Sequence, residues 1–138
     1  MAKIIPELVV AHMAKSMEFY TTLGFVQDNE GIVDDKGSQW YSLAMGDTTV
    51  WLLREDTVEG FDRGLQRGYG IHLYLTVSDV DLLYSTLQTS GARMNIVQEI
   101  ETQWYGLREF RVADPDGYVW TINMPVDAQA TDAVDGIN

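Results

Sequence analysis

The chain has 138 residues, 46% hydrophobic and 22% charged, which is the size and composition of one globular domain. Its 21 acidic and 9 basic residues give a formal net charge of −12, and a field of that sign repels phosphate backbones, so we expect no nucleic-acid partner. Because it has no cysteine, no apolar run near the ~20 residues of a membrane helix and no secretory signal, we exclude disulfides, thiolate metal sites and a membrane span, and expect a cytoplasmic protein.

The first half of the chain predicts one strand, one helix and three further strands. The strand at residues 4–10 contains Pro6, which cannot donate to a ladder, so this strand should lie at a sheet edge or begin its pairing after Pro6. The helix follows at 12–23, where apolar side chains recur every three to four positions, and Gly24 is placed to end it. The remaining strands are predicted at 25–27, 40–45 and 48–53, with a polar turn at 34–37 and a hairpin turn at 46–47.

A polar, glycine-rich stretch at 54–69 reads as the linker to a second half, which opens on the strand 71–77. This strand alternates strictly, so His72, Tyr74 and Thr76 share one face and the apolar residues share the other. An amphipathic run that opens at Ser78-Asp79 and closes at Gly91 predicts a helix to cover the apolar face. The other elements are strands at 94–99, 107–112 and 118–124, a loop at 101–106, a turn at 114–117 and a mobile tail at 126–138.

The two halves repeat the same order of elements, so we expect modules at about 4–53 and 70–124 within a single domain, 1–125. Val10 and Gly24 bracket the first helix as Val77 and Gly91 bracket the second, at an offset of 67 residues. On the last strands, 50–53 matches 119–122 at an offset of 69. The two modules should pair, because neither alone buries its sheet face.

Three motifs in this order resemble the vicinal-oxygen-chelate superfamily over residues 4–125. That superfamily includes glyoxalase I, extradiol dioxygenases, fosfomycin resistance enzymes and bleomycin resistance proteins. The resemblance implies an α+β fold of two βαβββ modules that form a cup-shaped, half-open sheet, and it implies a homodimer. The motifs are Phe19-Tyr20 before Leu23-Gly24-Phe25, Trp104-Tyr105-Gly106-Leu107-Arg108-Glu109-Phe110, and Asp114-Pro115-Asp116-Gly117.

The resemblance also implies four metal-ligand positions, on the first and last strands of each module. By the repeat they fall on Ile5, Leu52, His72 and Thr121. Two aliphatic side chains offer no donor and a threonine hydroxyl is a poor one, so a single histidine would be left to hold the ion. We therefore expect no metal and no cofactor, and His72 is interpreted as a residue of the cavity wall.

Without a metal, the chain is most similar to the bleomycin-resistance branch, whose members sequester a cationic antibiotic in aromatic-lined clefts at a dimer interface. The loop motif of that branch is altered here, because Trp104 stands in place of a proline and Tyr105 in place of a tryptophan. The ligand therefore need not be bleomycin.

Alternation along the strands predicts which side chains line the cavity. Four aromatic side chains are placed to sandwich a planar ligand, and Glu7 and Glu109 are placed to pair with a cationic group. For Glu109, an internal pair with Arg111 or Arg108 is an equal alternative. Val50 and Leu52 are predicted to face the cavity, with Trp51 and Leu53 in the core. The candidate ligand-binding residues are Glu7, Trp40, His72, Tyr74, Trp104, Tyr105, Glu109 and Arg111.

Three functions remain open. The first is a metal-free protein that binds a small molecule, for instance a cationic or aromatic antibiotic that it sequesters. The second is an enzyme of the same superfamily, of lyase, isomerase or dioxygenase type, in which His72 with Tyr74 or Glu109 transfers protons. The third is a structural or partner-binding module whose cavity is closed by side chains. The sequence favours the first, and we assign no catalytic residue.

Overall fold

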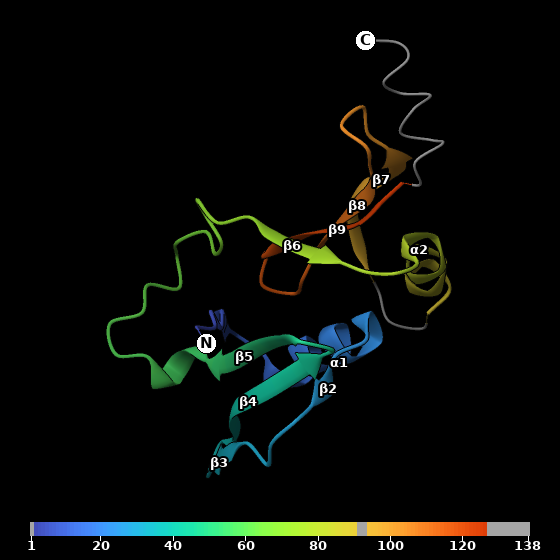
Figure 1. The fold of residues 1–138 in the computed structure, drawn as a ribbon. Helices are drawn as coiled ribbons and strands as arrows, with labels where there is room; N and C mark the ends of the chain where they lie inside the picture. The colour runs from blue at the N-terminus through green and yellow to red at the C-terminus, as the bar shows by residue number, and fades with distance from the viewer. Residues whose placement is uncertain (1, 91–93, 127–138) are drawn as a thin grey trace. The chain divides into compact units, whose positions relative to one another are not determined.

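The computed structural model describes residues 2–90 and 94–126 (Figure 1). It divides into an N-terminal unit, Met1–Arg67, and a C-terminal unit, Gly68–Asn138. The first unit contains β1 (Glu7–Val10), α1 (Met13–Leu23), β2 (Val26–Gln27), β3 (Ile32–Asp34), β4 (Gly37–Met45), β5 (Thr48–Arg54) and the 3₁₀ turn η1 (Glu55–Thr57). The second contains β6 (Leu73–Thr76), α2 (Val80–Thr89), β7 (Asn95–Thr102), β8 (Leu107–Ala113) and β9 (Val119–Pro125).

The sheet of the N-terminal unit has the order β1-β5-β4-β2, and β3 also pairs with β4. As predicted from Pro6, β1 lies at an edge and its parallel pairing with β5 begins at Glu7. The predicted helix is confirmed, and it ends at Gly24, whose φ of 122° suits glycine. The short strand β3 was not predicted.

The core of the N-terminal unit lies between α1 and one face of this sheet. Tyr20 is fully buried and its ring meets Phe19 and Phe25 edge to face, at centroid distances of 4.8 and 5.9 Å. From the sheet, the core receives side chains that alternate along the strands: Leu8, Val10, Leu43, Val50 and Leu52.

This core overturns one prediction about the repeat. In the N-terminal sheet Trp51 lies beside Glu7. In the C-terminal sheet the residue beside Tyr74, which is 67 positions after Glu7, is Thr121. The last strands therefore correspond at an offset of 70 residues and not 69.

A shift of one residue moves every side chain of a strand to the other face. Val50 and Leu52 therefore face α1, and Trp51 and Leu53 face the opposite side, which is the reverse of the prediction. The additional residue lies in the last turn: four residues separate the paired Ala44 and Thr49, whereas five separate the paired Ala113 and Val119.

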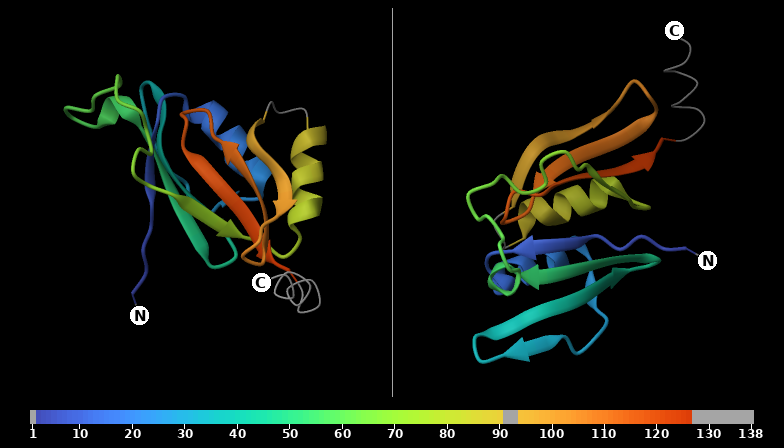
Figure 2. Two further views of the ribbon diagram at one scale, coloured as in Figure 1. Left: turned by 90° about the horizontal axis from the view of Figure 1, so that it is seen from above. Right: turned by 90° about the vertical axis from the view of Figure 1, so that its left-hand side faces the viewer.

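The sheet of the C-terminal unit has the order β6-β9-β8-β7, with β6 parallel to β9. The predicted helix is confirmed at Val80–Thr89, and the side chain of its N-cap Asp79 accepts from the Leu82 N–H at 3.0 Å. Figure 2 shows α2 alongside the strands of this sheet. The helix side of the sheet is apolar and buried, and its residues include Leu75, Phe110, Val112, Trp120 and Ile122.

Strand β6 is shorter than the predicted 71–77. The Ile71 N–H donates to the Gly68 carbonyl in a turn, so His72 precedes the strand. The predicted division of faces holds within β6, because Leu75 is buried while Tyr74 and Thr76 are exposed. The predicted helix end at Gly91 lies outside the described residues, as does the predicted mobile tail 126–138 except for Val126, whose N–H donates to the Gly106 carbonyl at 3.1 Å. Among the described helices, neither has the length and apolar character needed to cross a membrane.

Candidate functional site

The candidate site is the face of the C-terminal sheet that points away from α2. On this face three neighbouring strands each contribute a pair of polar side chains, because the apolar residues that alternate with them are used in the core. Tyr74 and Thr76 of β6 lie beside Thr121 and Asn123 of β9, which in turn lie opposite Arg111 and Glu109 of β8.

Glu109 is the most unusual residue of this face. Its side chain is only 1% exposed, and neither carboxylate oxygen has a hydrogen-bond partner among the residues that the structure describes. Burial raises the pKa of Glu109; Arg111 opposes this shift and Glu101, opposite Glu109 on β7, adds to it. Burying a carboxylate without partners costs several kcal/mol, so Glu109 is an unsatisfied hydrogen-bond acceptor in the free protein.

Arg111 follows Glu109 by two positions and therefore points to the same face. Its Nε is also buried and has no hydrogen-bond partner within the described part of the chain. Arg111 therefore makes no hydrogen bond to Glu109, although its charge lowers the pKa of that carboxyl. Arg108 lies on the helix side of β8 and pairs with Asp81, its Nε 3.0 Å and its Nη2 2.9 Å from Oδ1.

Two hydrogen bonds between side chains lie near Glu109, one between strands and one local. The Thr76 hydroxyl donates to Oδ1 of Asn123 at 2.7 Å and so joins the side chains of β6 and β9. Glu101 accepts from Nε2 of Gln103 at 3.0 Å. Asn123, Thr76, Glu101 and Gln103 thus have hydrogen-bond partners near Glu109, whereas the Glu109 carboxylate and Arg111 Nε have none among the described residues.

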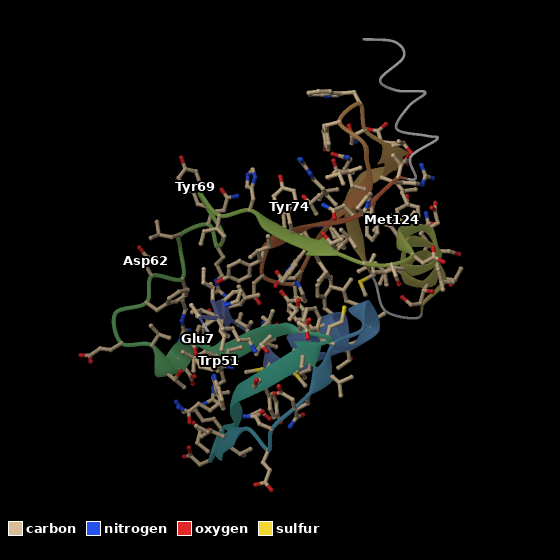
Figure 3. All side chains as sticks on the ribbon, viewed as in Figure 1. Glu7, Trp51, Asp62, Tyr69, Tyr74 and Met124 are labelled. Atoms are coloured by element: carbon tan, nitrogen blue, oxygen red, sulfur yellow. The ribbon has the colours of Figure 1, made fainter. Side chains whose placement is uncertain are left out.

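The aromatic candidates form two pairs in the C-terminal unit. The rings of His72 and Tyr74 are 6.3 Å apart, and Figure 3 shows Tyr74 on β6 pointing to the same side as Tyr69. Trp104 and Tyr105 meet edge to face at 5.4 Å in the turn between β7 and β8, where Trp104 is 80% exposed. The structure thus presents these rings to solvent instead of using them in the core.

The remaining candidates, Glu7 and Trp40, belong to the N-terminal unit and lie on the face of its sheet opposite α1. Trp51 joins them there, with its ring 5.4 Å from that of Trp40 and its backbone beside Glu7 (Figure 3). Sequence reasoning missed Trp51 because of the offset error. The signal that would have found it is the longer turn at Asp114–Tyr118.

The positions that the resemblance implies for a metal do not fit one. Ile5 precedes β1, Leu52 is buried against α1, and the true counterpart of Thr121 is Trp51, which has no suitable donor. Over residues 2–90 and 94–126, no three His, Asp or Glu side chains gather in a group that could hold a metal ion.

A hollow of about 570 Å³ lies on the helix side of the N-terminal unit, apart from the candidate site. Its polar groups are largely paired. Arg54 contacts Asp34 and Asp56, both at 2.6 Å, and its Nη1 donates to the Ser38 carbonyl at 3.2 Å. The hydroxyls of Ser38 and Tyr41 are 2.7 Å apart. Among the described residues that line the hollow, none has a buried side-chain atom without a hydrogen-bond partner, in contrast to Glu109. Its lining residues are His12, Met13, Ala14, Met17, Lys36, Ser38, Tyr41 and Arg54.

A family model matches most of the chain. Residues 4–122 match the family described as the Glyoxalase/Bleomycin resistance protein/Dioxygenase superfamily. The uncharacterized protein Mb0911c of Mycobacterium bovis is 28% identical over 127 residues, covering 88% of this chain and 82% of the relative.

Two solved structures illustrate the shared fold. A member of the same superfamily from Sphaerobacter thermophilus is 25% identical with a TM-score of 0.65, over 90% of this chain and 98% of that one. A bleomycin resistance determinant encoded on the transposon Tn5 is 20% identical with a TM-score of 0.62, over 91% of this chain and 98% of that one.

Proposed function

Because the chain belongs to the glyoxalase/bleomycin resistance protein/dioxygenase superfamily, we propose that it is a metal-free protein that binds a cationic or aromatic small molecule. The observation that carries this proposal is the buried, unpaired carboxylate of Glu109, considered among the described residues. Such a group is a cost in the free protein and becomes favourable when a ligand supplies hydrogen-bond donors.

The surroundings of Glu109 support a small organic ligand. The same face carries a hydroxyl, an amide and the phenol ring of Tyr74, and the C-terminal unit also exposes the rings of Trp104 and Tyr105. A few convergent polar groups among aromatic surface are typical of small-molecule sites. The net charge of −12 would attract cationic ligands towards the protein.

The proposal is tested by titrating a panel of cationic and aromatic antibiotics while tryptophan fluorescence and calorimetry are recorded. We expect saturable binding of at least one compound, and we expect Glu109→Gln to weaken it by about tenfold or more, because charge-assisted hydrogen bonds to the carboxylate are lost. Glu59→Gln, which removes the same charge from an exposed side chain of the N-terminal unit, is the matched control. No saturable binding by any compound, or a stoichiometric divalent ion in the purified protein, would contradict the proposal.

An acid–base enzyme is the second candidate, and the raised pKa of Glu109 is the observation in its favour. The two candidates differ in what happens to the bound compound. A binding protein releases it unchanged, whereas an enzyme converts it. Mass spectrometry of the ligand recovered after prolonged incubation with the protein distinguishes them.

A further inference from the structure

We propose that Glu109 and Arg111 form a two-point anchor, so that the ligand carries a protonated amine or amidine and, close to it, a hydrogen-bond acceptor such as a carbonyl oxygen. This inference rests on the proposed function and specifies the chemistry that the same site would recognise. It goes beyond the net charge of the ligand, because it assigns a separate role to each of the two side chains.

The geometry of β8 places the two groups within reach of one small molecule. Two positions along a strand correspond to about 6.6 Å, and both side chains leave the same face. The three buried side-chain atoms that lack partners in the described part of the chain are Glu109 Oε1, Glu109 Oε2 and Arg111 Nε. One carboxylate and one N–H donor on the same face of β8 are thus left without partners among the described residues.

The neighbouring residues do not fill these vacant hydrogen-bonding positions. Asn123 lies opposite Glu109; its Oδ1 accepts from Thr76, and its amide nitrogen donates to neither oxygen of Glu109. Thr121 lies opposite Arg111, and its hydroxyl makes no hydrogen bond to Nε of Arg111. The unsatisfied groups therefore match a ligand that donates to the carboxylate and accepts from the guanidinium.

Arg111 also discriminates between ligands. A simple amine that pairs with Glu109 brings a second positive charge near the guanidinium, which repels it. An acceptor next to the amine replaces this repulsion with a hydrogen bond to Nε. Arg111 is therefore a specificity-determining residue, which favours amino amides and similar compounds over plain amines.

Three matched compounds test the two-point anchor: phenylalaninamide has both groups, phenethylamine has only the amine, and 3-phenylpropanamide has only the amide. Protein-observed NMR titration is suitable, because ligands of this size bind in the millimolar range. We expect the wild type to bind phenylalaninamide at least about fivefold more tightly than either other compound. Glu109→Met should weaken both amines, and Arg111→Met should abolish the preference for phenylalaninamide over phenethylamine.

A measurement without ligand separates an anchor from a structural ion pair. If the two residues serve binding, the double variant Glu109→Met/Arg111→Met removes unsatisfied buried groups and raises Tm by about 3 °C or more. A lower Tm for the double variant would overturn the inference.

The binding results discriminate further. Three results would also overturn the two-point anchor. They are equal affinity for phenethylamine and phenylalaninamide, an unchanged preference for phenylalaninamide in Arg111→Met, and no binding of phenylalaninamide. If an antibiotic from the panel still binds in a Glu109-dependent way, the proposed function stands and only the two-point anchor fails.

Discussion

At the scale of single residues, two charged side chains show opposite arrangements. Arg54 has a partner for each of its nitrogens, in Asp34, Asp56 and the Ser38 carbonyl. Glu109 has none for either oxygen within the described residues. A side chain that is fully paired in the free protein stabilises the fold, whereas one that is buried and unpaired is destabilising and points to a binding role.

Arg54→Gln should lower Tm at neutral pH and have little effect at low pH. The hydrogen bonds from Arg54 lower the pKa values of Asp34 and Asp56 below their ordinary 3.8. Because the folded-state pKa values are depressed, this stabilisation is present above the unfolded pKa and is lost as the pH falls through the folded-state values.

Thermal unfolding of both proteins between pH 7 and pH 2 measures this effect. Arg63→Gln is the control, because Arg63 pairs with Glu55 at 3.3 Å from an exposed position and should contribute little. A Tm difference between Arg54→Gln and wild type that stays constant down to pH 2 would contradict the linkage.

The sequence predicted which face of the sheet carries Glu109, but not whether its carboxylate has a hydrogen-bond partner. Alternation along β8 was enough to place Glu109 and Arg111 on the face away from α2, because Phe110 and Val112 must enter the core. Whether Glu109 pairs with Arg108, with Arg111 or with neither depends on side-chain distances, which a pattern in one strand does not contain. The sequence therefore left the internal pair open; in the structure neither arginine donates a hydrogen bond to Glu109, although the charge of Arg111 still acts on it.

At the scale of elements, the two helices begin differently. Asp79 caps α2 with a hydrogen bond to the Leu82 N–H, whereas His12 at the same place before α1 makes no side-chain cap. The cap of α2 can be predicted from Asp79 itself, since aspartate is among the preferred N-cap residues and histidine is not.

Asp79→Ala should therefore destabilise the protein by about 1 kcal/mol, seen as a lower midpoint in urea unfolding. The matched variant His12→Ala removes an N-cap side chain that makes no cap, so its midpoint should stay close to that of the wild type. Asp79→Ser restores a cap oxygen and should recover most of the loss. Midpoints of Asp79→Ala and Asp79→Ser that are equal to each other and below that of the wild type would show that the charge matters and the cap does not.

Strands were predicted less completely than helices. The long alternating segments were found, but β3 was missed because three exposed residues carry no period. The observed face of β5 is the reverse of the predicted one because the dipeptide Val-Trp occurs in both halves but not at equivalent positions. Turn length determines that correspondence, and short sequence similarity does not.

At the scale of the whole molecule, order of elements carried more information than any single motif. Each unit has the sequence strand, helix and then strands, with β1 parallel to β5 and β6 parallel to β9. This duplicated arrangement was predicted, and the family match over residues 4–122 agrees with it. The ligand could not be predicted, because the members of one superfamily differ in the few side chains that line their sites.

A homodimer stays a prediction from the resemblance, and its measurement is direct. Light scattering coupled to size-exclusion chromatography should give about twice the chain mass of 15.6 kDa. The exposed rings of Trp104 and Tyr105 are consistent with a surface that becomes covered. A mass of one chain at all concentrations tested would contradict the prediction.

The additional residue between Ala113 and Val119 has a consequence for engineering by recombination. If mutations are transferred from one half to the other by an ungapped alignment, they fall on the wrong face of the final strand. A polar side chain intended for the face opposite the helix would then enter the hydrophobic core. A chimera that exchanges the complete hairpin, including its loop, would keep each side chain of the last strand on its original face.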